Sequence, residues 1–124
     1  IITLTIIFMF SFYFSHPPNL GIYKTIDNYD YNALKFISKN ENGIVLSPLL
    51  VSEAVFPITH FETVGTIYFS GNRTEVENFY INSDCKEQNE ILKRNNVKYV
   101  LSKTRLECNW TNIYDEKDFV YMVD

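Results

Sequence analysis

The chain contains few residues whose types and spacing could support catalysis. Ser47 and His60 are a nucleophile and a base of the kind that hydrolases use. Ser47 is better explained as a helix cap, because serine followed by a proline (Pro48) commonly begins a helix. His60 lies beside Phe61 and has no second ligand at metal-site spacing. We therefore predict no catalytic residue, no metal site and no cofactor. A small soluble hydrolase that uses Ser47 and His60 is the weakest alternative.

Composition and charge argue against further classes of protein. The four glycines are scattered, so the chain has no glycine-rich phosphate loop. The net charge is −4 and the longest basic cluster is Lys93-Arg94, so the clustered cations that bind phosphate backbones are missing. We therefore expect no nucleic-acid partner. The acidic residues Asp115, Glu116 and Asp118 are more typical of a solvated turn than of a cation site.

Hydrophobic periodicity predicts alternating helices and strands after residue 28. Helices are expected over 29–40, from Ser47 to about Pro57, and from the capping boxes that begin at Thr74 and Asp84. Strands are expected over 44–46, 63–70 and 97–102, followed by a hairpin of 110–114 and 119–123. This order predicts an α/β fold, with a small mostly parallel sheet, helices on both faces and a C-terminal antiparallel hairpin.

The predicted sheet has one edge where a ligand is expected. Ligands of open α/β sheets bind beyond the carboxyl ends of the strands. The residues at those ends, which form the candidate ligand edge, are Ser47, Ser70, Asn72 and Ser102. This set is small and contains no convincing catalytic group.

Two cysteines bear on the compartment. Cys85 begins a predicted helix and Cys108 follows the next predicted strand, so both lie at the carboxyl edge of the sheet. A disulfide between them would close a loop of about 22 residues and contribute roughly 3 kcal/mol. The alternative is a pair of free buried thiols. A disulfide favours a location outside the reducing cytosol.

The first fourteen residues are almost entirely apolar. As a helix they span about 21 Å, which is shorter than the ~30 Å hydrocarbon core of a bilayer. A signal peptide would need a basic segment and a small-residue cleavage site, and this segment has neither. A buried helix of a soluble domain would need a polar face, and none is marked here. We expect residues 1–16 to be the end of a transmembrane helix whose first turns precede Ile1. Residues 17–28 are then a linker, and residues 29–124 an extracytoplasmic domain.

Two N-glycosylation sequons begin at Asn72 and Asn109. Such tripeptides often arise by chance in a chain rich in asparagine. Taken with the cysteines and the apolar segment, they agree with a domain that faces outward. Asn72 and Asn109 are therefore the candidate glycosylation sites.

Five segments share their order and a loose consensus with a known family: YDYNALKFISKN, GIVLSPLLVSEAVFPIT, TVGTIYFSG, NEILKRNNVKYVLSK and WTNIYDEKDFVYMVD. Together they resemble the extracytoplasmic C-terminal region of multi-spanning membrane glycosyltransferases that use lipid-linked sugars of the dolichyl-phosphate type. The similarity covers nearly the whole chain and includes no catalytic motif. In that family the catalytic carboxylates lie in an early external loop, so no catalytic residue is carried over to this chain.

The resemblance implies a non-catalytic, outward-facing tail domain that positions the acceptor or the lipid-linked sugar donor. The implied partners are the lipid bilayer, a lipid-linked sugar and an acceptor glycan or protein. The implied location is the cell membrane, with the globular domain on the extracytoplasmic side. The alternative is a single-span cell-surface domain for adhesion or sugar binding.

Overall fold

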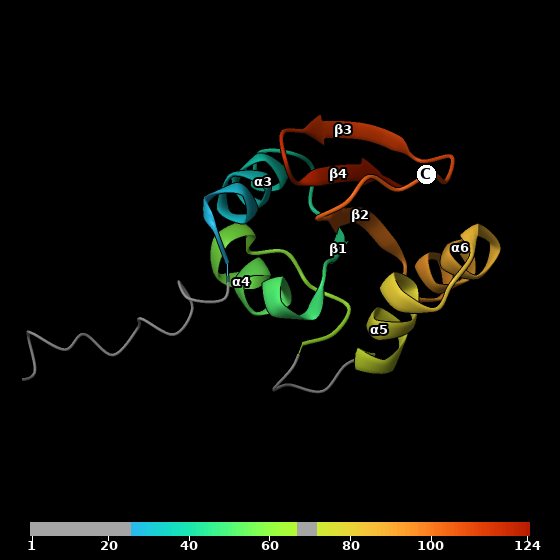
Figure 1. Cartoon of the computed structure of the whole chain (residues 1–124). Helices are drawn as coiled ribbons and strands as arrows, with labels where there is room; N and C mark the ends of the chain where they lie inside the picture. Colours follow the sequence, from blue (N-terminus) through green and yellow to red (C-terminus); the bar gives the residue numbers. More distant parts are fainter. Residues whose placement is uncertain (1–25, 67–71) are drawn as a thin grey trace, which may run out of the picture.

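The structure is a computed structural model and describes residues 26–66 and 72–124 (Figure 1). The described residues form four helices and four strands. The helices are α3 (Asn28–Ser38), α4 (Leu49–Thr59), α5 (Arg73–Ile81) and α6 (Cys85–Arg94). The strands are β1 (Ile44–Leu46), β2 (Val97–Ser102), β3 (Thr111–Asp115) and β4 (Phe119–Met122).

The strands form one mixed sheet in the order β1-β2-β4-β3. β1 and β2 are parallel, with Val45 opposite Tyr99. β4 is antiparallel to both of its neighbours, β2 and β3. The chain passes from β1 to β2 through α4, α5 and α6, as a parallel pair requires a long crossover. The predicted α/β fold with a C-terminal hairpin is confirmed, but the sheet is mixed rather than mostly parallel.

This difference concerns the strand predicted over residues 63–70. Thr63 makes an isolated parallel bridge with Val45, but the described residues 63–66 do not form a strand. The N–H of Asn72 donates to the carbonyl of Val64 at 3.1 Å, so the chain folds back on itself here. Gly65 permits this, because a Cβ at that position would lie 2.9 Å from the backbone nitrogen of Arg73. Residues 67–70 of the predicted strand lie outside the described residues.

Capping residues explain where two helices begin. Asp27 caps α3: its Oδ1 accepts from the N–H of Asp30 at 2.8 Å. The carboxylate of Asp30 in turn accepts from the N–H of Asp27 at 3.0 Å, which completes a reciprocal capping box. Asp84 caps α6 in the predicted way, by accepting from the N–H of Glu87 at 2.8 Å.

Two other predicted caps are wrong. Pro48, not Ser47, occupies the cap position of α4, and its carbonyl accepts the first helical N–H bonds. Among the described residues, the buried Oγ of Ser47 has no hydrogen-bond partner. Thr74 is already inside α5, whose cap position is taken by Asn72. The Asn72 side chain makes no capping bond, and its amide nitrogen donates to Oδ1 of Asn95 at 2.5 Å.

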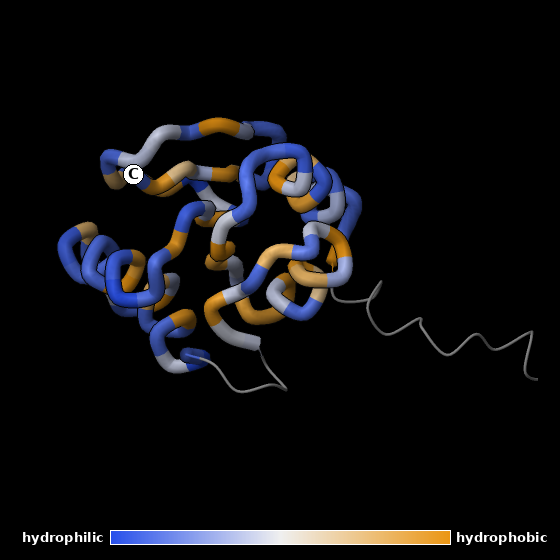
Figure 2. The backbone as a smooth tube through the Cα atoms, turned by 180° about the vertical axis from the view of Figure 1, so that it is seen from behind, coloured by the Kyte–Doolittle hydropathy of each residue, from blue (hydrophilic) through white to orange (hydrophobic). Residues whose placement is uncertain are grey.

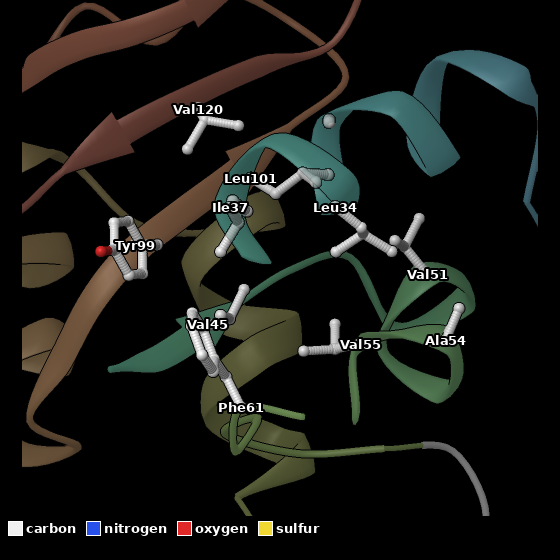
Figure 3. Close-up of a cluster of buried hydrophobic side chains, with 11 residues drawn as sticks. Leu34, Ile37, Val45, Val51, Ala54, Val55, Phe61, Tyr99, Leu101 and Val120 are labelled. Atoms are coloured by element: carbon white, nitrogen blue, oxygen red, sulfur yellow. The ribbon is translucent and has the colours of Figure 1, made fainter. Parts of the chain in front are cut away.

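Each face of the sheet carries its own hydrophobic cluster. α3 and α4 cover one face, where Leu34 and Val55 pack with Leu101 of β2 (Figure 3). α5 and α6 cover the other face, where Phe79 and Leu92 pack with the neighbouring strand residues. α6 is mostly hydrophilic along its length, since only one of its sides faces the sheet (Figure 2). The predicted placement of helices on both faces is confirmed.

Within residues 26–66 and 72–124, no helix is both long enough and apolar enough to cross a bilayer. The predicted transmembrane segment, residues 1–16, lies outside the described residues, as does most of the predicted linker. Both stay predictions.

Truncation of Phe79 tests the second cluster. Phe79 is fully buried and packs against the rings of Tyr80 and Trp110. We expect Phe79→Ala to lower the free energy of unfolding by about 3–5 kcal/mol, measured by urea denaturation. Phe56 is 58% exposed, so the matched change Phe56→Ala should cost less than about 1 kcal/mol. Equal losses for the two variants would contradict this packing.

Candidate functional site

The carboxyl ends of β1 and β2 lie side by side and are joined by Tyr80, a partly buried tyrosine of α5. The hydroxyl of Tyr80 donates to the carbonyl of Leu101 at 2.6 Å and lies 3.3 Å from the carbonyl of Leu46. Burial holds the pKa of Tyr80 well above its ordinary value, so the hydroxyl keeps the proton that it donates. Tyr80 therefore satisfies backbone carbonyls at the edge where a ligand is expected.

A charged cluster stands at the same edge. Lys103 directly follows β2, and its Nζ lies 2.8 Å from Oδ1 of Asp30 and 3.2 Å from Oδ2 of Asp27. The side chain of Asp30 is almost wholly buried, whereas those of Asp27 and Lys103 are partly exposed. The hydrogen bond from the N–H of Asp30 and the ammonium of Lys103 hold the pKa of Asp27 below its usual value. The beginning of α3 is thus tied to the end of β2.

Asp118 completes this cluster from the turn between β3 and β4. Its residue is only 2% exposed, so the predicted solvated turn is wrong at this position. One carboxylate oxygen from each of Asp27, Asp30 and Asp118 lies within 4.8 Å of the others. Burial, a hydrogen bond with Asp30 and the negative charge of Asp30 raise the pKa of Asp118 to about 7. Asp118 therefore holds a proton through most of the acidic range.

The negative charges of this cluster are balanced from within it, by the ammonium of Lys103 and by a proton. Three carboxylates can hold a divalent cation, but the ammonium of Lys103 already lies against two of them. The remaining carboxylate, that of Asp118, is compensated by a proton when the pH is below its pKa of about 7. The cluster can therefore exchange a proton near neutral pH, and it carries excess negative charge once that proton is lost.

A cavity of about 330 Å³ opens beside the cluster. Its walls come from the first turn of α4 and the outer side of α5, and they are mainly apolar, with Leu50 and Ile81 among them. Asp30 and Lys103 reach into it from the charged cluster. An apolar cavity of this size with a few convergent polar groups is typical of a small-molecule site. A larger hollow, of about 610 Å³, lies beyond the amino end of β2 around Val97, and its lining includes the charged residues Lys86, Glu90, Lys93 and Asp124.

The residues of the predicted ligand edge have different surroundings. Ser47 and Ser102 are both buried at the strand ends, and Oγ of Ser102 accepts from the N–H of Thr104 at 3.2 Å. Asn72 is exposed and bonded to Asn95, as described above. Ser70 lies outside the described residues. Ser47 and Ser102 therefore lie at strand ends, and ligand binding at this edge stays a prediction. The charged groups at the edge were not predicted.

The structure does not bring Ser47 and His60 together. They flank α4 at its two ends, and a helix of 11 residues separates them by about 16 Å. His60 is exposed, adopts a left-handed conformation with φ 63° and contacts Phe56 edge to face. The hydrolase alternative therefore has no support from this geometry.

The residues that sequence reasoning missed are Asp30, Tyr80 and Lys103. Asp30 is the third residue of α3 and Tyr80 the eighth of α5, so neither follows a predicted strand. Lys103 does follow a predicted strand directly, and its position was the signal that could have revealed the site.

The predicted disulfide is present: Cys85 and Cys108 are bonded, with Cα atoms 5.6 Å apart. It joins the first residue of α6 to the loop that follows β2, as the predicted topology requires. Asn109, the second candidate glycosylation site, is exposed directly after this bridge. Both candidate asparagines are thus accessible.

Comparison of the chain with protein-family models, curated proteins and solved structures gave no match.

The raised pKa of Asp118 makes stability depend on pH. An unfolded aspartate ionises near pH 4, whereas folded Asp118 ionises near 7. Between these values the unfolded chain releases its proton first, so this residue makes the free energy of unfolding fall as pH rises. We expect Asp118→Asn to flatten this decline and to be more stable than the wild type at pH 7, in urea denaturation at pH 4, 5.5 and 7.

Asp115 provides the matched control for that measurement. It is the last residue of β3, directly before the turn that carries Asp118, and it is exposed and pairs with Arg105 on the surface. Asp115→Asn should keep the wild-type decline between pH 4 and 7. A wild-type slope in Asp118→Asn, or a flattened slope in Asp115→Asn, would contradict the assignment.

Proposed function

We propose that this chain is the outward-facing, non-catalytic tail domain of a membrane glycosyltransferase that uses a lipid-linked sugar. The observation that carries the outward location is the disulfide between Cys85 and Cys108. Disulfides persist in oxidising compartments and are rare in the cytosol. The glycosyltransferase part of the proposal rests on the resemblance of the five sequence segments.

We assign the binding role of this domain to the 330 Å³ cavity at the carboxyl edge. Its position at the ends of β1 and β2 is the usual one for ligands of α/β sheets. There it would hold part of the acceptor or of the lipid-linked donor while the chemistry occurs elsewhere in the enzyme. A single-span cell-surface domain for adhesion or sugar binding would use the same cavity, so the membrane context separates the two functions.

The location is tested by peptide mapping of the full chain, purified from its native membrane without reduction. We expect a peptide pair linked through Cys85 and Cys108, because both sulfurs form one bridge. Free thiols on both residues, trapped by alkylation before lysis, would contradict an outward location. The thiols of a reduced and refolded sample serve as the control for alkylation.

The parent enzyme is tested by the coding sequence that precedes Ile1. A glycosyltransferase of this type requires many hydrophobic spans, with acidic residues in the first external loop. A start codon followed by one span would instead support the adhesion or sugar-binding alternative.

The exposed sequons give a further prediction for expression in a glycosylating secretory pathway. Asn72→Gln and Asn109→Gln should each remove one glycan-sized mass increment, since both side chains are exposed. Glycan attachment at Asn72 uses the amide that bonds Asn95, so we expect lower occupancy there than at Asn109. Unmodified chains, alongside a modified control glycoprotein in the same cells, would contradict an outward location.

A further inference from the structure

We infer that the cavity at the carboxyl edge binds a small primary amine with a short aliphatic body. The inference rests on the binding role proposed above and extends it by naming the chemical class of the ligand. It does not depend on which enzyme carries the domain.

The walls of the cavity supply the site for an aliphatic body. Leu50 is 62% exposed and Ile81 is 75% exposed, although both line the same cavity. Leu49 and Val76 lie on the same lining. These large apolar side chains converge on one opening, and an aliphatic ligand that binds there would remove their exposed surface from water.

The charges around the cavity favour a cation. Four carboxylates lie in or directly beside it, namely those of Asp27, Asp30, Glu77 and Asp118. Two cations face them: Lys103 pairs with Asp27 and Asp30, and Arg73 pairs with Glu77 at 3.1 Å. The carboxylates therefore outnumber the cations. An ammonium group that enters the cavity is attracted by the excess negative charge, whereas an anion is repelled.

Two buried carboxylate oxygens belong to the acidic cluster beside the cavity. Oδ1 of Asp30, a lining residue, lies 2.8 Å from Nζ of Lys103. Oδ2 of Asp118 is buried, and the carboxyl group of Asp118 is hydrogen-bonded with Asp30 while it holds its proton. Once that proton is lost, an ammonium group, which has three N–H donors and no acceptor, is complementary to the two carboxylates.

A metal ion and an anion fit the cavity less well. A divalent cation needs six or more oxygen ligands, whereas the walls here are mainly apolar and Lys103 already occupies part of the acidic cluster. An anion would have only Lys103 as its partner, and that ammonium already contacts both Asp27 and Asp30. A primary amine carries a single positive charge and needs at most three acceptor oxygens, so it fits the cavity better than either.

The test compares three four-carbon ligands of similar size: n-butylamine, n-butanol and butyrate. Each is titrated at pH 7.5 into the ¹⁵N-labelled full chain in one fixed detergent, and Kd is taken from the amide shifts. We expect butylamine to shift amides of α4, α5 and Lys103, with a Kd at least tenfold below that of butanol. Equal Kd values for amine and alcohol, or tighter binding of butyrate, would overturn the inference.

Two variants identify the binding surface, each with a matched control. Ile81→Ser removes an exposed apolar wall and should weaken butylamine binding about three- to tenfold. Phe56→Ser removes a similarly exposed side chain outside the cavity and should leave Kd unchanged. Glu77→Gln should weaken binding of the amine but not of butanol, whereas Glu87→Gln on α6 should change neither. Equal effects within either pair would contradict the assigned cavity.

These outcomes are separable from those of the proposed function. If the disulfide is intact but butylamine does not bind, only the inference of an amine ligand is contradicted. Free cysteines in the native membrane, with amine binding intact, contradict the outward location alone.

Discussion

The ion pair between Asp30 and Lys103 is the interaction on which the candidate site depends. Asp30 is almost wholly buried, and a buried carboxylate is costly unless a cation or hydrogen bonds compensate it. Lys103 provides that compensation from the end of β2, while Asp30 also closes the capping box of α3. One carboxylate therefore fixes both where α3 begins and how it sits on the sheet.

The disulfide reinforces this arrangement from the other end of the loop that carries Lys103. That loop leaves β2 after Ser102 and is held at Cys108 by its bond to Cys85. Between these points the N–H of Leu106 donates to the hydroxyl of Tyr121 at 2.8 Å. The position of the lysine is thus set by a strand, a hydrogen bond and a covalent bridge. Reduction would remove one of these constraints and loosen the site as well as the fold.

Most of the helices and strands could be predicted because their signals are local. The apolar run of β2, the capping residue Asp84 and the Asn42-Gly43 break after α3 each act within a few residues. β-branched and aromatic composition predicted a strand over 63–70, but residues 63–66 form only an isolated bridge, and Gly65 closely approaches the start of α5. That contact joins segments whose proximity only the tertiary fold determines.

The candidate site could be located but not described from the sequence. Ser47 and Ser102 each follow or end a predicted strand. The order of helices and strands predicts that these strands run parallel, so their carboxyl ends lie at one edge of the sheet, where ligands are expected. The burial of Asp118 could not be foreseen, since an acidic residue in a hairpin turn is ordinarily solvated. It is buried because Asp30 and Lys103, which are distant in sequence, meet the turn of the hairpin.

The most direct test is a ¹³C NMR titration of the carboxyl group of Asp118, with and without n-butylamine. Without the amine we expect an apparent pKa of about 7, because Asp118 is buried beside Asp30. A bound ammonium should lower that pKa, since it stabilises the carboxylate form. An ordinary pKa near 4 that the amine leaves unchanged would contradict both the buried cluster and its role as a cation-selective site.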